Sequence, residues 1–228
     1  MRSLRAIGRI VAVLAVAAAL GGCNLVVSPA PMFTAGDAHG LPALRSGVWA
    51  SPDAGCSFKS ADPFDKWPHC ANGAIVGPDS ISGPATTPSD AASSAPPASE
   101  QTVVPYILAG RDPRVMQVRF GAALTKGAPP VVLYYFVALR PVASDASGQI
   151  TAAQIWPVQC GPPPPKNAKV DANTNPNDLA TRHPLPGMKL DNGLCAPADK
   201  AAVVNAAKAS RAWADQIATL RWIRDGTK

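Results

Sequence analysis

The segment between residues 102 and 158 constrains the fold most, because it contains four strand-like runs joined by short connections. The first two runs, Thr102–Leu108 and Arg114–Phe120, flank the turn-forming sequence Gly110–Pro113. In the second run, positions 116, 118 and 120 are all apolar. Apolar residues at alternate positions are typical of a strand with one buried face.

The third run, Val131–Leu139, is almost wholly apolar, which is typical of a central strand that is covered on both faces. A fourth strand is expected at Gln149–Val158, after a turn at Ser147 and Gly148. Because these strands follow one another without an intervening helix, they predict an antiparallel meander.

The chain before this segment carries weaker signals. Short strands are expected at Ser46–Ser51 and Ala74–Val76, on either side of an irregular loop at residues 52–72. Residues 82–100 are mostly Ser, Pro, Ala and Thr, without a large apolar side chain. Such a segment cannot bury enough surface to offset its ordering entropy, so a disordered insert is predicted at about 82–100.

The chain after it predicts one long helix. Residues 198–224 are rich in alanine and contain neither glycine nor proline, with Asp199 as an N-cap and Gly226 just after the end. Apolar or small residues recur there at three- and four-residue steps, at Val203, Ala206, Ser210, Trp213, Ile217 and Leu220. This stripe predicts packing against the sheet rather than on a membrane.

The expected fold class is therefore α+β. We predict an antiparallel sheet of about six strands, with disulfide-stapled loops and the C-terminal helix packed on the sheet. Residues 46–228 are expected to form a single globular domain.

The N-terminus has the layout of a secretory signal. Arg2, Arg5 and Arg9 precede an apolar run, Ile10–Leu20, which is too short to cross a bilayer as a helix. The run ends in the sequence Leu20-Gly21-Gly22-Cys23.

This sequence resembles the lipobox of bacterial lipoproteins. The resemblance implies that residues 1–22 are cleaved off, that Cys23 carries a diacylglycerol, and that its new amino group is acylated, for instance with palmitate. No other cofactor is expected. An ordinary signal peptide, or a single membrane anchor with an incidental cysteine, is the alternative.

The residue after Cys23 is Asn24 rather than aspartate. In the lipoproteins that the lipobox resembles, this implies a periplasm-facing place on the outer membrane, with the inner membrane as the alternative. Residues 23–45 contain three prolines and two glycines without periodicity, which predicts a flexible lipidated tether.

Four cysteines remain after lipidation: Cys56, Cys70, Cys160 and Cys195. An even number in an oxidising compartment predicts two disulfides, for which three pairings exist. We favour Cys56–Cys70 and Cys160–Cys195, because each pair brackets one irregular, proline-rich segment. A zinc site is disfavoured, because the four lack a closely spaced pair.

Composition argues against nucleic acid as a partner. The net charge is +6, but three of the basic residues lie in the signal, and no Lys/Arg-rich run occurs in the chain. The membrane, an envelope protein or an apolar small molecule are the partners that we expect.

No catalytic or metal-binding set is evident, so a non-enzymatic protein is expected. The three histidines, His39, His69 and His183, have no recognisable nucleophile beside them, and the chain lacks G-x-S-x-G. The sequence Asp171–Asn175 imitates the start of a calcium loop, but Pro176 stands where such a loop needs glycine.

Several aromatic side chains could form either the core or an apolar ligand pocket. These candidates are Trp49, Trp156, Tyr134, Phe136 and Trp213.

Two resemblances bear on function. Gly47-Val48-Trp49 resembles the G-x-W motif of lipocalins, which implies an up-and-down barrel that holds a lipid or another small apolar ligand. Together with Trp67–Ala71, Trp156–Gly161 and Trp213, the same motif also resembles a group of uncharacterised alphaproteobacterial lipoproteins, from which no function transfers.

The leading functional prediction is a membrane-anchored envelope lipoprotein with a binding or scaffold role in the periplasm. A lipocalin-like carrier of a lipid or small apolar ligand is the alternative, and a cell-envelope hydrolase is the second alternative. A sheet that encloses a cavity would favour a ligand, whereas a solid core would favour a protein partner.

Overall fold

A computed structural model describes residues 24–83, 102–122, 131–163, 183–191, 194–214 and 217–226. The expected signal peptide with Cys23, most of the expected insert at 82–100 and the calcium-like sequence at 171–175 lie outside these residues. Among the described residues, no helix is long and apolar enough to cross a membrane.

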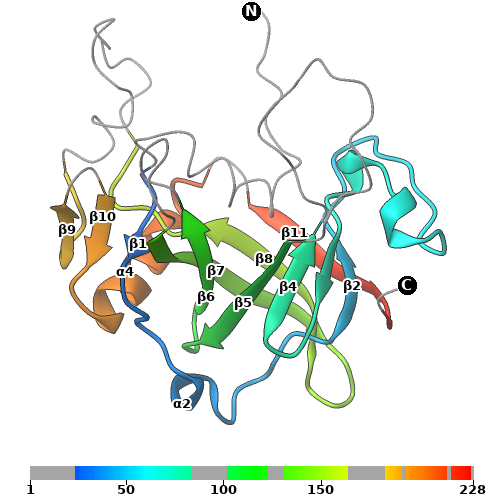
Figure 1. Cartoon of the computed structure of the whole chain (residues 1–228), viewed down its shortest axis with the longest axis horizontal. Coiled ribbons are helices and arrows are strands. Elements are labelled where there is room, and N and C mark those ends of the chain that lie inside the picture. The colour runs from blue at the N-terminus through cyan, green and yellow to red at the C-terminus, as the bar shows by residue number, and fades with distance from the viewer. Residues whose placement is uncertain are drawn as a thin grey trace, which may run out of the picture.

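Eight antiparallel strands form a closed barrel (Figure 1). They are β2 (Gly47–Ala50), β3 (Ala74–Val76), β4 (Ser80–Gly83), β5 (Thr102–Ala109), β6 (Arg114–Ala122), β7 (Val131–Ser144), β8 (Ile150–Pro157) and β11 (Ala218–Arg224). Each strand pairs with the next one along the chain, and β11 pairs with both β8 and β2. The barrel is therefore an up-and-down meander whose last strand closes it.

The predicted α+β fold with an open sheet of about six strands is wrong. The meander at 102–158 is present as β5 to β8. The strands expected at Ser46–Ser51 and Ala74–Val76 are present as β2 and β3, whereas β4 was not counted as a strand and the C-terminal strand was assigned to a helix.

The C-terminal helix, α4 (Lys200–Ser210), is shorter than predicted. It starts where expected, because the side chain of Asp199 accepts a hydrogen bond from the amide of Ala202. Residues 218–224 form β11 instead, and Leu220 joins the barrel interior while Arg221 is exposed. Inward and outward side chains alternate in this segment, and residues 217, 219 and 223 are β-branched, which favours a strand. These two features outweigh the preference for a helix that the alanine-rich residues upstream express.

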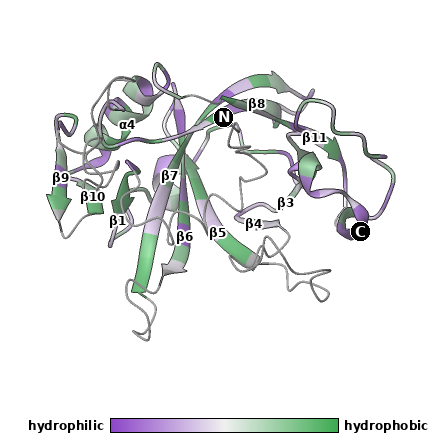
Figure 2. Ribbon diagram, turned by 90° about the horizontal axis from the view of Figure 1, so that it is seen from above, coloured by the Kyte–Doolittle hydropathy of each residue, from purple (hydrophilic) through white to green (hydrophobic). Residues whose placement is uncertain are grey.

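A second layer covers one side of the barrel wall (Figure 2). It consists of α4, β1 (Val27–Ser28), β9 (Met188–Asp191) and β10 (Leu194–Pro197). Side chains from the outer faces of β6, β7 and β8, such as Val115, Phe136 and Trp156, form a buried cluster with Val203 and Ala206 of α4. The disulfide Cys160–Cys195 ties this layer to the end of β8.

The other predicted disulfide, Cys56–Cys70, is also present. It lies in the loop at 52–72, which contains two short 3₁₀ helices, η1 (Phe64–Lys66) and η2 (His69–Ala71). Phe64 packs on Val48 and Ile75, so this loop covers the outer face of β2 and β3.

Residues 24–45, for which the sequence predicts a flexible tether, lie along the barrel wall and across one end of it. β1 pairs with β7 at Tyr134 and Tyr135, beside the point where β8 ends. The buried side chain of Gln117 in β6 exchanges hydrogen bonds with the backbone of Phe33. The short helix α2 (Ala35–Ala38) follows, and Asp37 forms an ion pair with Lys200 of α4.

Candidate functional site

Residues 41–46 close one end of the barrel, next to the hairpin that joins β7 to β8. The amide of Arg45 donates to the carbonyl of Ile150 at 2.9 Å, and the amide of Ile150 donates to the carbonyl of Ala43 at 2.8 Å. The side chain of Leu44 is buried in the interior cluster of the barrel. This segment therefore forms a cover over the closed end.

The sequence Gly47-Val48-Trp49 lies at the same end. Trp49 is fully buried in the barrel, and its Nε1 donates to the carbonyl of Arg45 at 2.8 Å. Gly47 has a φ of 136°, and a Cβ at this position would overlap the carbonyl oxygen of Arg224. Gly47 thus allows β2 to approach its neighbour β11 closely, and Trp49 fills the closed end.

The interior near this end is tightly packed. Five apolar side chains, which we call the floor, are each at most 2% exposed: Leu44, Trp49, Leu139, Ile150 and Ala153. These five side chains leave almost no surface accessible to water.

Other interior side chains are slightly less buried than the floor. We call six apolar or aromatic side chains the interior lining: Val104, Tyr106, Leu108, Met116, Val137 and Ile155. Val137 is half-buried, and the others keep 5–8% of their surface accessible. These side chains belong to the interior cluster and line the inward face of the barrel wall.

A charged side chain lies among these apolar groups. Arg114 alternates with Met116 and Val118, whose side chains are in the interior cluster, and it is only 3% exposed. Its Nη2 donates to the carbonyl of Leu108 at 2.9 Å, and its Nη1 donates to the carbonyl of Pro42 in the cover. Burial lowers the pKa of the Arg114 guanidinium.

Tyr106 is the polar member of the interior lining. Its hydroxyl donates to the carbonyl of Gly77 at 3.1 Å. Burial, with a further contribution from Asp79, raises the pKa of Tyr106 to about 12. The phenol therefore remains neutral at physiological pH and supplies a polar group in an otherwise apolar wall.

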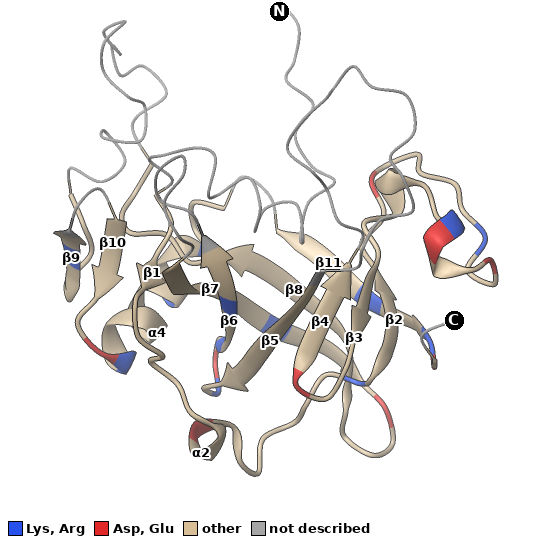
Figure 3. Cartoon of the chain, viewed as in Figure 1, with Lys and Arg blue, Asp and Glu red and all other residues tan. Residues whose placement is uncertain are grey.

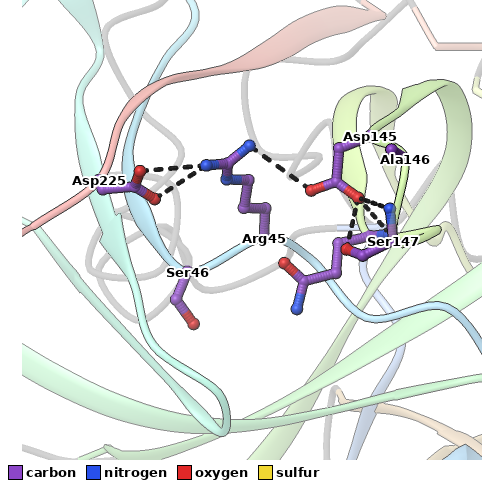
Figure 4. A pocket seen from close by; sticks show the side chains of 7 residues that line it. Arg45, Ser46, Asp145, Ala146, Ser147 and Asp225 are labelled. Carbon is purple, nitrogen blue, oxygen red and sulfur yellow. Dashed lines mark hydrogen bonds and ion pairs between the residues drawn. The ribbon is translucent and has the colours of Figure 1, made fainter.

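A second feature lies outside the barrel at the closed end, where a depression of about 420 Å³ surrounds Arg45 (Figure 4). Arg45 donates from Nη2 to both carboxylate oxygens of Asp225, at 3.1 and 3.0 Å, and its Nη1 lies 3.5 Å from Asp145. Its guanidinium also stacks 3.8 Å above the ring of Trp222.

The charges of this depression are already paired within the protein. Asp145 accepts hydrogen bonds from the hydroxyl of Ser147 and the amides of Ser147 and Gln149, and these bonds lower its pKa. Asp145 thereby holds the β7–β8 hairpin, while Arg45 joins that hairpin to the end of β11. We call Arg45 with Asp145 and Asp225 the latch, because these ion pairs hold the hairpin and the end of β11 together at the closed end of the barrel.

The predicted aromatic candidates do not converge on one pocket. Trp49 lies in the floor, whereas Trp156 and Phe136 are buried in the layer outside the wall, and Tyr134 packs against that layer. The indole of Trp156 donates to the carbonyl of Ala207 in α4 at 2.9 Å. Trp213 is half-buried in the turn after α4.

The chemistry-bearing residues of the sequence are also dispersed. His39, His69 and His183 are exposed and lie in different segments. Within the described ranges, no group of three His, Cys, Asp or Glu side chains is placed to hold a metal ion. Charged residues are spread over loops and strands rather than gathered on one surface (Figure 3).

Sequence reasoning missed Arg114 and Tyr106. The alternation in Arg114–Phe120 already placed residue 114 on the same face as Met116 and Val118, so an inward arginine could have been inferred. The signal for Tyr106 is weaker, because Pro105 interrupts the strand pattern beside it.

Comparisons with known proteins returned no match: no protein-family model, no curated protein and no solved structure is similar to this chain.

Proposed function

We propose that this chain is a non-enzymatic binding protein that takes a small apolar molecule into the barrel, against the interior lining. The observation that carries the proposal is that inward side chains of the interior lining, inside a closed barrel, keep accessible surface. An eight-stranded barrel is wide enough either to be filled by side chains or to hold one small ligand. The lipocalin-like alternative is thus preferred to the scaffold.

We further propose that the barrel is held at a membrane by lipid on Cys23, with the outer membrane as the expected place. The residue after Cys23 is bound to the domain: the Asn24 side chain donates to the carbonyl of Gly161 at 2.6 Å and accepts from its amide at 3.0 Å. A lipid on Cys23 would therefore hold the barrel close to the membrane. A Cys23→Ser variant should appear in the soluble periplasmic fraction. Retention of this variant with membranes would contradict lipid anchoring.

Ligand binding can be tested by a substitution that places a larger side chain among the residues of the interior lining. Val137 and Val132 both lie on β7, but Val137 packs with the interior cluster, whereas Val132 is 41% exposed. Titration of the Cys23→Ser protein with N-phenyl-1-naphthylamine, a neutral apolar dye, should show saturable fluorescence enhancement. Adding Val137→Trp should weaken binding by about tenfold or more, because an indole occupies the space that the dye needs.

Val132→Trp is the matched control, since it adds the same indole at an outward position. The control should bind the dye as the parent does. Equal binding by both tryptophan variants would place the dye elsewhere and contradict the proposal.

A protein partner is the second candidate. Val103 on β5 and Val132 on β7 are 62% and 41% exposed and could contact a partner. Cross-linking in intact envelopes through a photoreactive residue at position 132 should capture a defined partner if this surface is an interface. A comparable yield at the exposed position Ser147 would show that capture is not specific.

A further inference from the structure

The burial and the hydrogen bonds of Arg114 indicate which class of ligand the barrel would bind. This side chain lies at the inner end of the interior lining, close to the floor. Arg114 is opposite Leu139 of the floor, and two residues farther along β6, Met116 is opposite both Leu108 of β5 and Val137 of β7. A molecule that lies on Leu108, Met116 and Val137 therefore has one end at Arg114.

The positive charge of Arg114 has no anionic partner in the described part of the chain. Its side-chain hydrogen bonds go to two backbone carbonyls, and none of the ion pairs formed by the described residues includes it. A buried charge without an opposite charge is strongly unfavourable. The neighbouring Tyr106 hydroxyl offers a dipole rather than a charge.

One nitrogen of the guanidinium also has no hydrogen-bond partner. Nε of Arg114 is buried and has no hydrogen-bond partner in the structure. Buried donors are nearly always paired, because each unpaired one loses its hydration without compensation. The guanidinium thus combines an uncompensated charge with an unfilled donor at the end of an apolar lining.

We propose that the molecule bound in the barrel is an apolar acid, whose carboxylate accepts a hydrogen bond from Nε of Arg114 while its hydrocarbon body lies on the interior lining. This inference rests on the proposed function. The carboxylate supplies the missing opposite charge, and a hydrogen bond between two charged groups is stronger than one between neutral groups. A neutral molecule of the same length fills the lining but leaves Arg114 uncompensated.

The test compares an acid with the matching alcohol. Sodium laurate and 1-dodecanol, which share a twelve-carbon chain, are each titrated against the Cys23→Ser protein loaded with N-phenyl-1-naphthylamine, and displacement is followed by fluorescence. We expect laurate to bind about tenfold tighter than dodecanol, as a charge-assisted hydrogen bond implies. Equal affinities would overturn the inference.

Arg114→Leu removes the charge and the donor and should abolish the preference for the acid. Arg114→Lys is the second variant, because it keeps the charge and a donor for one of the carbonyls but loses the planar group. It should retain a smaller preference for laurate and remain folded if Arg114→Leu does not. An undiminished preference in either folded variant would place the carboxylate elsewhere and refute the assignment.

The outcomes separate this inference from the proposed function. If the dye binds but laurate has no advantage, the barrel binds apolar molecules and the acid assignment is wrong. If neither the dye nor laurate binds, and native mass spectrometry finds no laurate adduct, both are wrong.

Discussion

A single ion pair joins the helices α2 and α4. Asp37 and Lys200 are far apart in the sequence, yet Nζ of Lys200 donates to both carboxylate oxygens of Asp37, at 2.6 and 2.8 Å. Asp37 also accepts from the amide and hydroxyl of Thr34. These bonds, with that from Lys200 the strongest, lower the pKa of Asp37 to about 2.

A pKa that is lower in the folded state than the ordinary 3.8 makes stability depend on pH. The contribution of Asp37 is fully present above about pH 4 and is lost as the pH falls toward 2. Asp37→Asn should therefore lower the thermal midpoint at pH 7, and the difference from the parent should shrink as the pH approaches 2. Circular dichroism melts at several pH values measure this.

The control for this prediction is Asp65→Asn. Asp65 is exposed and lies 3.7 Å from its sequence neighbour Lys66, so its loss should leave the midpoint nearly unchanged at every pH. A constant difference for Asp37→Asn from pH 7 to pH 2 would contradict the account of its pKa.

For Arg114, the sequence predicts the direction of the side chain but not its contacts. Its inward position follows from alternation with Met116 and Val118, which the sequence displays. Its contact with Pro42 does not, because nothing in the sequence places residues 41–46 across the closed end. Long-range crossings of this kind depend on tertiary packing rather than on local pattern.

At the scale of elements, the sequence predicted six of the eight barrel strands, and it missed β4 and β11. The four strands from β5 to β8 are long, with clear alternation or continuous apolar runs, and all four were predicted. β3 was predicted with its observed bounds, whereas β4, which contains four residues, was not counted as a strand, because so short a segment shows no period. The pairing of Cys56 with Cys70 and of Cys160 with Cys195 was also predicted correctly, since each bridge closes one irregular segment.

The largest error concerns β11. Val203, Ala206 and Ser210 recur with helical spacing and do form α4, but Leu220 fits the same stripe by coincidence. Neither glycine nor proline marks the boundary, because the chain leaves the helix through the turn at residues 211–213. Closure of the barrel therefore could not be inferred from the predicted elements.

Charge substitutions on β11 distinguish a strand from a helix. Leu220→Asp places a carboxylate in the barrel interior, where Leu220 is 4% exposed, and should cost several kcal/mol or prevent folding. Thr219→Asp, one residue earlier on the opposite face, should cost about 1 kcal/mol or less. Urea unfolding measures both, and similar losses in the two variants would contradict an alternating strand.

At the scale of the whole molecule, the two ends of the barrel differ. One end has a cover at residues 41–46, a tryptophan floor and the latch of Arg45 with Asp145 and Asp225. Above the floor, the interior lining keeps accessible surface. Packing at one end stabilises the fold, and an eight-stranded barrel is wide enough to hold one small ligand in its interior, which the proposed function requires.

The sequence indicated this organisation only through three residues. Gly47-Val48-Trp49 resembles the lipocalin motif, and the structure gives the motif a physical reason in the close crossing of β2 with β11 and in the filled closed end. The identity of the bound molecule depends instead on the interior lining, whose six side chains come from the four strands β5 to β8. No local pattern encodes such a surface.

The most direct test of the account is native mass spectrometry of the Cys23→Ser protein purified gently from the periplasm. We predict an adduct of defined mass that is displaced by N-phenyl-1-naphthylamine and is absent from the Val137→Trp variant. A protein that carries no adduct and does not bind the dye would contradict the central claim that the barrel holds an apolar ligand.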